Sequence, residues 1–290
     1  MGPGRSQGDE PLKDVLKHLW HILPAWALLV AISSGSFWAL TALQDFPGSG
    51  APPAVVMRAV LASTFLIACV LAYITLRSRW TGTQLVCAVF VVYFGVNTFV
   101  PISQAFLLVP GLMTPALGAV LTAHGFIVAL TFSFALVLLT GRMWQPGPAA
   151  ESARLHLPAG EWLWKLALSA GVSVGLYLLG QAVTRPYVSE FYGQAGLPPL
   201  GERVILQTGR ALLLLAFVLP AIKMMKGGRW EAAVTVGLLL CILAGVTPLA
   251  MPTSVLPDRV RYLHMAEAGA RDFVYGSLVG YLFSRQREGF

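Results

Sequence analysis

The sequence predicts an all-α polytopic membrane protein with about eight transmembrane helices. Its 290 residues are 56% hydrophobic and only 11% charged, and its mean hydropathy is +0.70. Soluble domains carry about 25% charged residues, so most of the outer surface is expected to face lipid. The apolar runs are continuous over about 20 residues, the length of a spanning helix. Membrane β-barrels instead alternate polar and apolar residues in segments of about ten.

Eight apolar segments, bounded by proline, glycine or basic residues, are expected to cross the bilayer. They cover residues 19–43, 55–76, 84–107, 115–140, 162–182, 204–225, 232–250 and 259–283. The first is too long for a signal-peptide core and is expected to be retained. Thr114 and Pro115 predict the N-cap and first residue of the fourth helix. A loop is expected over 183–203.

These segments divide the chain into two four-helix halves around a polar linker. The N-terminal region has apolar residues at i, i+3, i+4 and i+7, which predicts an amphipathic helix lying in the membrane interface. We expect a cytoplasmic tail with this interfacial helix (1–18), a first four-helix half (19–140), a cytoplasmic linker (141–161), a second four-helix half (162–284) and a cytoplasmic tail (285–290).

The basic residues predict the orientation of the chain. They gather in both tails and in the loops after the second, fourth and sixth spans, as with Arg77, Arg142 and Lys226, whereas the opposite loops hold only Arg185 and Arg203. Positive loops stay inside, so both termini are expected to be cytoplasmic, in a cytoplasmic (inner) membrane. The net charge of +7 is thus assigned to topology and to anionic headgroups. No basic domain with interleaved aromatics is present, and no nucleic-acid partner is expected.

A weak internal repeat relates the two halves. An offset of 150 residues aligns Arg79-Trp80 with Arg229-Trp230, and Gly95-Val96 with Gly245-Val246. Each half would enter the membrane from the same side. This pattern suggests a parallel 4+4 repeat about an axis along the membrane normal.

The last span holds the densest ionisable groups in the chain. Arg261, His264, Glu267 and Arg271 share one helix face, and Asp272 points about one residue further round. A charge at the bilayer centre costs about 3 kcal/mol on insertion scales. The stripe is therefore expected to face the bundle interior or a hydrated cavity, where Glu267 and Arg271 should neutralise each other.

Polar residues in other spans are the candidate partners of this stripe. Arg58 begins the second span, and a slightly different repeat offset places His124 of the fourth span over His264. The candidates for ligand binding or proton coupling are His264, Glu267, Arg271, Arg210, Gln207 and His124.

Three functions are compatible with this polar stripe. In a small transporter or ligand-binding protein, Arg210 and Arg271 would hold a small anionic or lipid-like ligand, with His264 and Glu267 as a proton-coupled pair. Its pocket would lie between the second, fourth, sixth and eighth spans. In a membrane-embedded enzyme acting on a lipid or isoprenoid, His264 would be the base and Glu267 would orient it. In a non-catalytic scaffold subunit, the stripe would be a structural set of ion pairs.

No cofactor or metal is expected. His264 and Glu267 have the i, i+3 spacing of carboxylate-bridged metal bundles, but such sites need a second pair, and His124 has no acid three residues later. The three cysteines all fall in predicted spans at long spacing. They are expected to be buried small hydrophobes without disulfides.

Two glycine motifs predict close helix packing. Gly171-x-x-x-Gly175 lies in the fifth span and Gly276-x-x-x-Gly280 in the eighth. The small residues 33–36 of the first span are likewise expected to serve packing, because no histidine or lysine stands out as a partner for a serine nucleophile.

Several features of the second half occur together. They are Arg261-x-x-His264-x-x-Glu267 followed by Phe273-x-x-Gly276, Arg185-Pro186-Tyr187 with Phe191-Tyr192, and Gln207-x-x-Arg210 with Leu219-Pro220. This set resembles a group of uncharacterised bacterial eight-helix membrane proteins, above all in their last helix. The resemblance implies the same fold and implies no activity.

Overall fold

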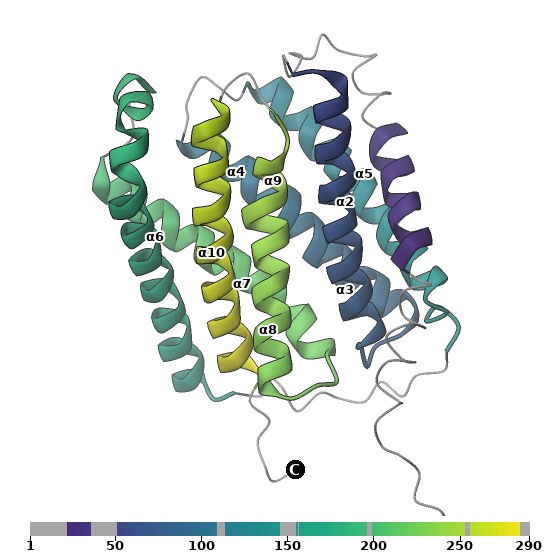
Figure 1. The fold of residues 1–290 in the computed structure, drawn as a ribbon. Coiled ribbons are helices and arrows are strands. Elements are labelled where there is room, and N and C mark those ends of the chain that lie inside the picture. Colours follow the sequence, from purple (N-terminus) through teal and green to yellow (C-terminus); the bar gives the residue numbers. More distant parts are fainter. Residues whose placement is uncertain are drawn as a thin grey trace, which may run out of the picture.

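The protein is a bundle of long helices standing side by side (Figure 1). This computed structural model describes residues 22–35, 51–108, 114–145, 155, 157–195, 199–252 and 256–284. Within these residues there is no strand, only an isolated bridge between Ser78 and Met225, so the all-α prediction is confirmed. The predicted tails, 1–18 and 285–290, and residues 146–154 and 156 of the predicted linker lie outside the described residues.

Six of the described helices are long and apolar enough to cross a membrane. These are α2 (Pro53–Leu76), the continuous α3 (Gly82–Phe94), η1 (Gly95–Phe99) and α4 (Val100–Leu108), α5 (Pro115–Leu139), α6 (Ala159–Ala195), α7 (Leu200–Met224), and the continuous α8 (Arg229–Leu240), η2 (Cys241–Val246) and α9 (Thr247–Ala250). The helix Ile22–Gly35 is shorter. The more polar α10 (Asp258–Phe283) has 26 residues, enough to span a bilayer.

Large apolar side chains cover the outside of the bundle, as expected for a multi-pass membrane protein. Phe134, Leu179 and Ile205 are examples, each exposed on a different helix. Cys87 is also exposed, so the prediction that all three cysteines are buried is wrong. A thiol is small and weakly polar, and facing lipid costs it little.

The N-terminal end of α5 and the C-terminal end of α6 test two boundary predictions. The Thr114 side chain accepts a hydrogen bond from the Leu117 amide (3.2 Å), and Pro115 begins α5, so the predicted cap is confirmed. The predicted loop over 183–203 is wrong, because α6 continues through Pro186 to Ala195. A proline removes only one helical donor, and the Thr184 hydroxyl reinforces the preceding turn by donating to the Gly180 carbonyl (2.9 Å).

Two predicted spans contain a π-helical segment that ends two residues before a proline. Pro101 follows η1, and Pro248 follows η2. A proline ring clashes with the carbonyl four residues earlier and donates no hydrogen bond to it. Those carbonyls belong to Asn97 in η1 and Ala244 in η2, so the wider π turn relieves the clash in both helices.

Two pairs of helices in the two halves begin at the same interval. α2 and α7 begin at residues 53 and 200, and α3 and α8 begin at 82 and 229, which is 147 residues in both pairs. This interval is three shorter than the offset that aligns identical residues. The two π-containing helices also touch, since the Thr247 hydroxyl donates to Asn97 Oδ1 (2.9 Å).

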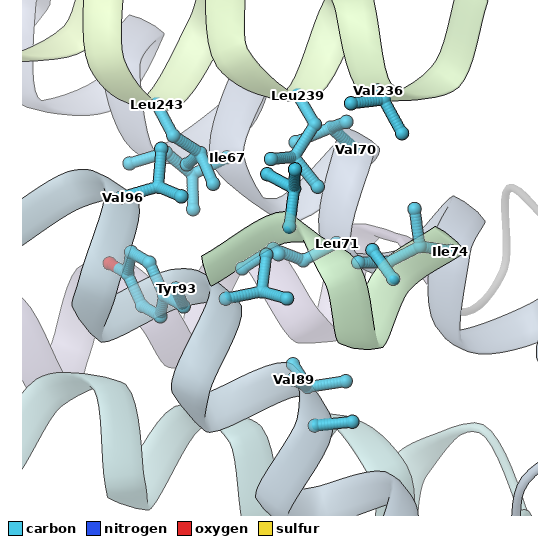
Figure 2. Close-up of a cluster of buried hydrophobic side chains, with 14 of the residues drawn as sticks. Ile67, Val70, Leu71, Ile74, Val89, Tyr93, Val96, Val236, Leu239 and Leu243 are labelled. Carbon is cyan, nitrogen blue, oxygen red and sulfur yellow. The ribbon is translucent and has the colours of Figure 1, made fainter. Parts of the chain in front are cut away.

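The apolar core joins the two halves of the chain. Figure 2 shows Leu71 of α2, Val89 and Tyr93 of α3, and Leu239 of α8 among the side chains of one buried cluster. All four are 4% exposed or less. Burial of a large apolar side chain contributes about 1.5–3 kcal/mol in water. In lipid the same residues contribute mainly through close packing.

The glycines of α10 allow it to approach α8 closely. A Cβ on Gly276 would lie 2.6 Å from the Val236 carbonyl oxygen, and one on Gly280 would lie 2.5 Å from that of Ala232. The packing role predicted for this motif is confirmed. The same role is wrong for Gly171-x-x-x-Gly175, because nothing lies within 4 Å of a Cβ at either position.

This difference gives a matched test of helix packing. Gly280→Ala should lower the stability of the purified protein by about 1–3 kcal/mol, because the added methyl group overpacks the contact with α8. Gly175→Ala should be neutral or stabilising, since alanine is the better helix former by about 1 kcal/mol. Thermal unfolding in detergent measures both. Equal effects of the two substitutions would contradict the α8–α10 contact.

Candidate functional site

A buried ion pair joins α7 to α10. Arg210 donates from Nη1 to Asp272 Oδ1 (2.9 Å) and from Nη2 to Oδ2 (2.6 Å). The two side chains are 2% and 1% exposed. At a rise of about 1.5 Å per residue, Arg210 lies about 15 Å from the start of α7 and Asp272 about 21 Å from the start of α10. The pair thus sits near the middle of both helices in the two-pronged geometry that favours arginine–carboxylate recognition.

The pair extends into a network that reaches two further helices. Arg210 Nε donates to Gln104 Oε1 of α4 (2.9 Å). On α10, Arg271 donates from Nε to Asp272 Oδ1 (3.2 Å) and from Nη1 to Glu267 Oε1 (3.1 Å). The expected Glu267–Arg271 ion pair is therefore confirmed. Two arginines alternate with two carboxylates, so the network as a whole is electrically balanced.

The Glu267 end of this network packs against α6. His264 Nδ1 lies 3.8 Å from Glu267 Oε2, which is longer than a hydrogen bond. The Glu267 carboxylate also lies against Gly180, where a Cβ would be 2.5 Å from Oε1. Only glycine at this position lets α6 cover the acid.

The other predicted site residues divide between two places. Gln207 is buried one turn from Arg210 and donates from Nε2 to the Ser173 hydroxyl of α6 (3.2 Å). His124 lies on α5, which packs against α3 and η1 on the opposite side of the bundle from α6 and α10 (Figure 1). Arg58 is exposed on α2. His124 and Arg58 are therefore not brought to the network.

The sequence prediction missed Asp272, the centre of the network. Asp272 was expected to point away from the charged stripe, yet it is the acid that Arg210 and Arg271 share. The signal for it lay in α7: a single arginine inside an apolar helix needs an acid on a neighbour. Helix periodicity within α10 alone could not reveal that α7 approaches on the Asp272 side.

Arg261 belongs to a separate structural contact. Its Nη1 donates to the carbonyls of Leu249 (3.2 Å) and Ala250 (2.8 Å), and its Nη2 donates to Asp258 (2.7 Å). A cation is favourable at the C-terminal end of a helix, where free carbonyls gather. Arg261 thus caps α9, and the predicted four-residue stripe is reduced to His264, Glu267 and Arg271.

A cavity of about 250 Å³ lies beside Arg210, between α4, α6 and α7. Its polar lining consists of Ser103, Gln104, Tyr177, Arg203, Gln207 and Arg210. The apolar residues of its wall include Ile205 and Leu213, which are exposed, so the cavity opens towards the outside of the bundle. This cavity lies between the third, fifth and sixth predicted spans, whereas the pocket was expected between the second, fourth, sixth and eighth.

No protein-family model, curated protein or solved structure matches the chain. The resemblance of α10 to the last helix of uncharacterised eight-helix membrane proteins thus stays a prediction. The function has to be inferred from the network and the cavity themselves.

The network predicts an asymmetric response to loss of charge. Asp272→Asn should destabilise the protein by about 3–5 kcal/mol, because it leaves Arg210 and Arg271 buried with one acid between them. The double variant Arg210→Met/Asp272→Leu, which removes both charges, should lose less. Glu202→Gln is the control, since Glu202 is exposed on α7 and forms no ion pair with the described residues. Unfolding midpoints in detergent rank the variants, and a double variant less stable than Asp272→Asn would contradict the ion-pair assignment.

Proposed function

We propose that this is a multi-pass protein of the cytoplasmic (inner) membrane that binds a small anion in the cavity beside Arg210, as a small transporter or ligand-binding protein. The observation that carries the proposal is Arg203. Its Nε is buried without a hydrogen bond within the described residues, and none of these residues forms an ion pair with it. Because the Arg210–Asp272–Arg271–Glu267 network is balanced, Arg203 gives the cavity an excess positive charge.

Arg210 shapes the cavity without supplying that charge. Its guanidinium is already bound by Asp272 and Gln104, so it fixes the deep wall. Arg203 lies seven residues earlier on α7, two turns along the same face, and lines the same cavity. An anion that accepts a hydrogen bond from Arg203 satisfies a buried donor, whose isolation costs about 1–3 kcal/mol. Ser103, Tyr177 and Gln207 offer neutral hydrogen-bonding groups between the two arginines.

The size of the cavity limits the ligand. Pockets for drug-sized molecules measure about 300–1,000 Å³, so 250 Å³ suits an inorganic oxyanion, a short carboxylate or the phosphate group of a larger amphiphile. His264 and Glu267 remain candidates for proton coupling, because they continue the same network towards the start of α10. Arg203 lies near the start of the neighbouring α7.

We further propose eight spans arranged as two parallel four-helix repeats. Three observations support this: the interval of 147 residues that two pairs of helix starts share, the paired π segments η1 and η2, and the hydrogen bond between Asn97 and Thr247. Contact between equivalent helices is what a two-fold axis along the membrane normal would produce. In such an arrangement α10 is the eighth span, and its charges are tolerated because they are paired inside the bundle.

The proposed orientation predicts where fused reporters are active. Alkaline phosphatase, which folds only outside the cytoplasm, should be inactive when fused after Phe290 and active when inserted between α6 and α7. A fluorescent protein at the C-terminus should be bright. The reverse pattern would contradict cytoplasmic termini, and activity at both positions would contradict the spans between them.

The anion proposal predicts a specific loss on neutralising Arg203. Arg203→Gln should weaken anion binding about tenfold or more, since hydrogen bonds to charged groups contribute about 1.5–3 kcal/mol, and should leave folding intact. Inorganic phosphate, sulfate and succinate are the probes, by calorimetry on the purified protein and by uptake into proteoliposomes.

Arg185→Gln is the matched control, because Arg185 is exposed on α6 away from the cavity lining. Binding without uptake would favour a ligand-binding role over transport. Equal binding by Arg203→Gln and the unaltered protein would refute the cavity as the anion site.

A further inference from the structure

A second open space lies at the other end of the bundle, where α10 ends. It is a groove of about 630 Å³ between α2 and α8. Its walls are mostly apolar, with Val70, Val234, Leu238 and Ile242 along its length. From Trp230 to Ile242 the groove follows α8 for about 18 Å, which is close to half of a bilayer core about 30 Å thick. The groove thus has the length of one leaflet's hydrocarbon layer.

The polar end of the groove is closed by an ion pair. Arg77 donates from Nε (2.6 Å) and Nη2 (2.8 Å) to the Glu231 carboxylate, and the Tyr73 hydroxyl donates to the same group (3.2 Å). Glu231 and Arg77 neutralise each other. Trp230 beside them is 75% exposed, and tryptophan is enriched at the membrane interface.

Two further cations stand next to this ion pair. The turns after α2 and α7 bind each other, since the Arg79 amide donates to the Met224 carbonyl (2.6 Å) and the Lys226 amide donates to the Arg77 carbonyl (3.0 Å). This pairing holds Arg79 and Lys226 side by side. The Gly227 backbone in turn lies against the Glu231 carboxylate, which places both cations at the polar end of the groove.

No acid among the described residues forms an ion pair with Arg79 or Lys226. Within the described residues the Arg79 guanidinium makes one long hydrogen bond, 3.5 Å to the Lys226 carbonyl, and the Lys226 ammonium makes neither a hydrogen bond nor an ion pair. Partial burial and the neighbouring Arg142, Arg77 and Arg79 lower the pKa of Lys226. A negative group at this position would relieve that repulsion.

We propose that an anionic phospholipid binds here, with one acyl chain in the α2–α8 groove and its phosphate between Arg79 and Lys226. The groove supplies an apolar slot one leaflet deep, and the paired turns supply two cations where the headgroup would lie. This site is independent of the anion cavity, which lies toward the opposite ends of α7 and α10. A zwitterionic lipid would fill the groove equally well and would gain less from the cations.

The test compares dioleoylphosphatidylglycerol with dioleoylphosphatidylcholine on the full-length protein in detergent, by native mass spectrometry and thermal unfolding. The protein should bind the phosphatidylglycerol at least tenfold more tightly. A basic residue near anionic lipid contributes about 1 kcal/mol, so Arg79→Gln and Lys226→Gln should each reduce that preference about fivefold. Arg259→Gln, an exposed cation at the other end of α10, should leave it unchanged.

A second variant separates the acyl-chain site from the charges. Val234→Trp should fill the groove and weaken the binding of both lipids, while far-ultraviolet circular dichroism verifies that the helices are intact. Equal affinity for the two lipids in the unaltered protein would overturn the proposal. So would stabilisation by glycerol 3-phosphate equal to that by phosphatidylglycerol, because the groove would then contribute nothing.

Discussion

The charge of Asp272 can be buried only because Arg210 reaches it from another helix. An isolated carboxylate at this depth would be several kcal/mol less stable than one in water, and the two-pronged bond from Arg210 offsets that cost. The requirement fixes the rotation of both helices, since neither charge can turn towards lipid. The bond to Gln104 then ties α4 to the same point. Glu267, held by Arg271, lies against Gly180 and carries the constraint to α6. Four helices are aligned by one charged chain.

The remaining surface of α10 explains how such a polar helix fits in the bundle. On one side its glycines meet the backbone of α8, with Gly276 against the Val236 carbonyl. On another side the Tyr275 hydroxyl donates to the Ala211 carbonyl of α7 (2.6 Å). α10 is therefore enclosed between α6, α7 and α8 (Figure 1). Close backbone contact and charge pairing are complementary here: the first excludes lipid, and the second makes the enclosed charges tolerable.

Features set by one helix alone were predictable from the sequence. The spans follow from hydropathy, the start of α5 from Thr114 and Pro115, and the Glu267–Arg271 pair from i, i+4 spacing. Features that depend on a second helix were not. Gly276 and Gly171 occupy the same kind of motif, yet only Gly276 has a neighbour to approach. Asp272 was misplaced for the same reason, because its partner lies 62 residues away in the chain.

Cations that pair with an acid and cations that do not lie in different places among the described residues. Deep in the bundle, Arg210 and Arg271 are balanced by Asp272 and Glu267. Two cations without an acid partner among the described residues lie elsewhere. Arg203 lines the cavity, and Lys226 lies in the turn whose Gly227 adjoins Glu231 at the end of the groove. A charge left unmatched beside an opening can be satisfied by a molecule that enters, whereas the same charge in the closed interior would oppose folding. The deep network is therefore best understood as the structural frame of the bundle, and the two proposed anion-binding sites lie at its margins.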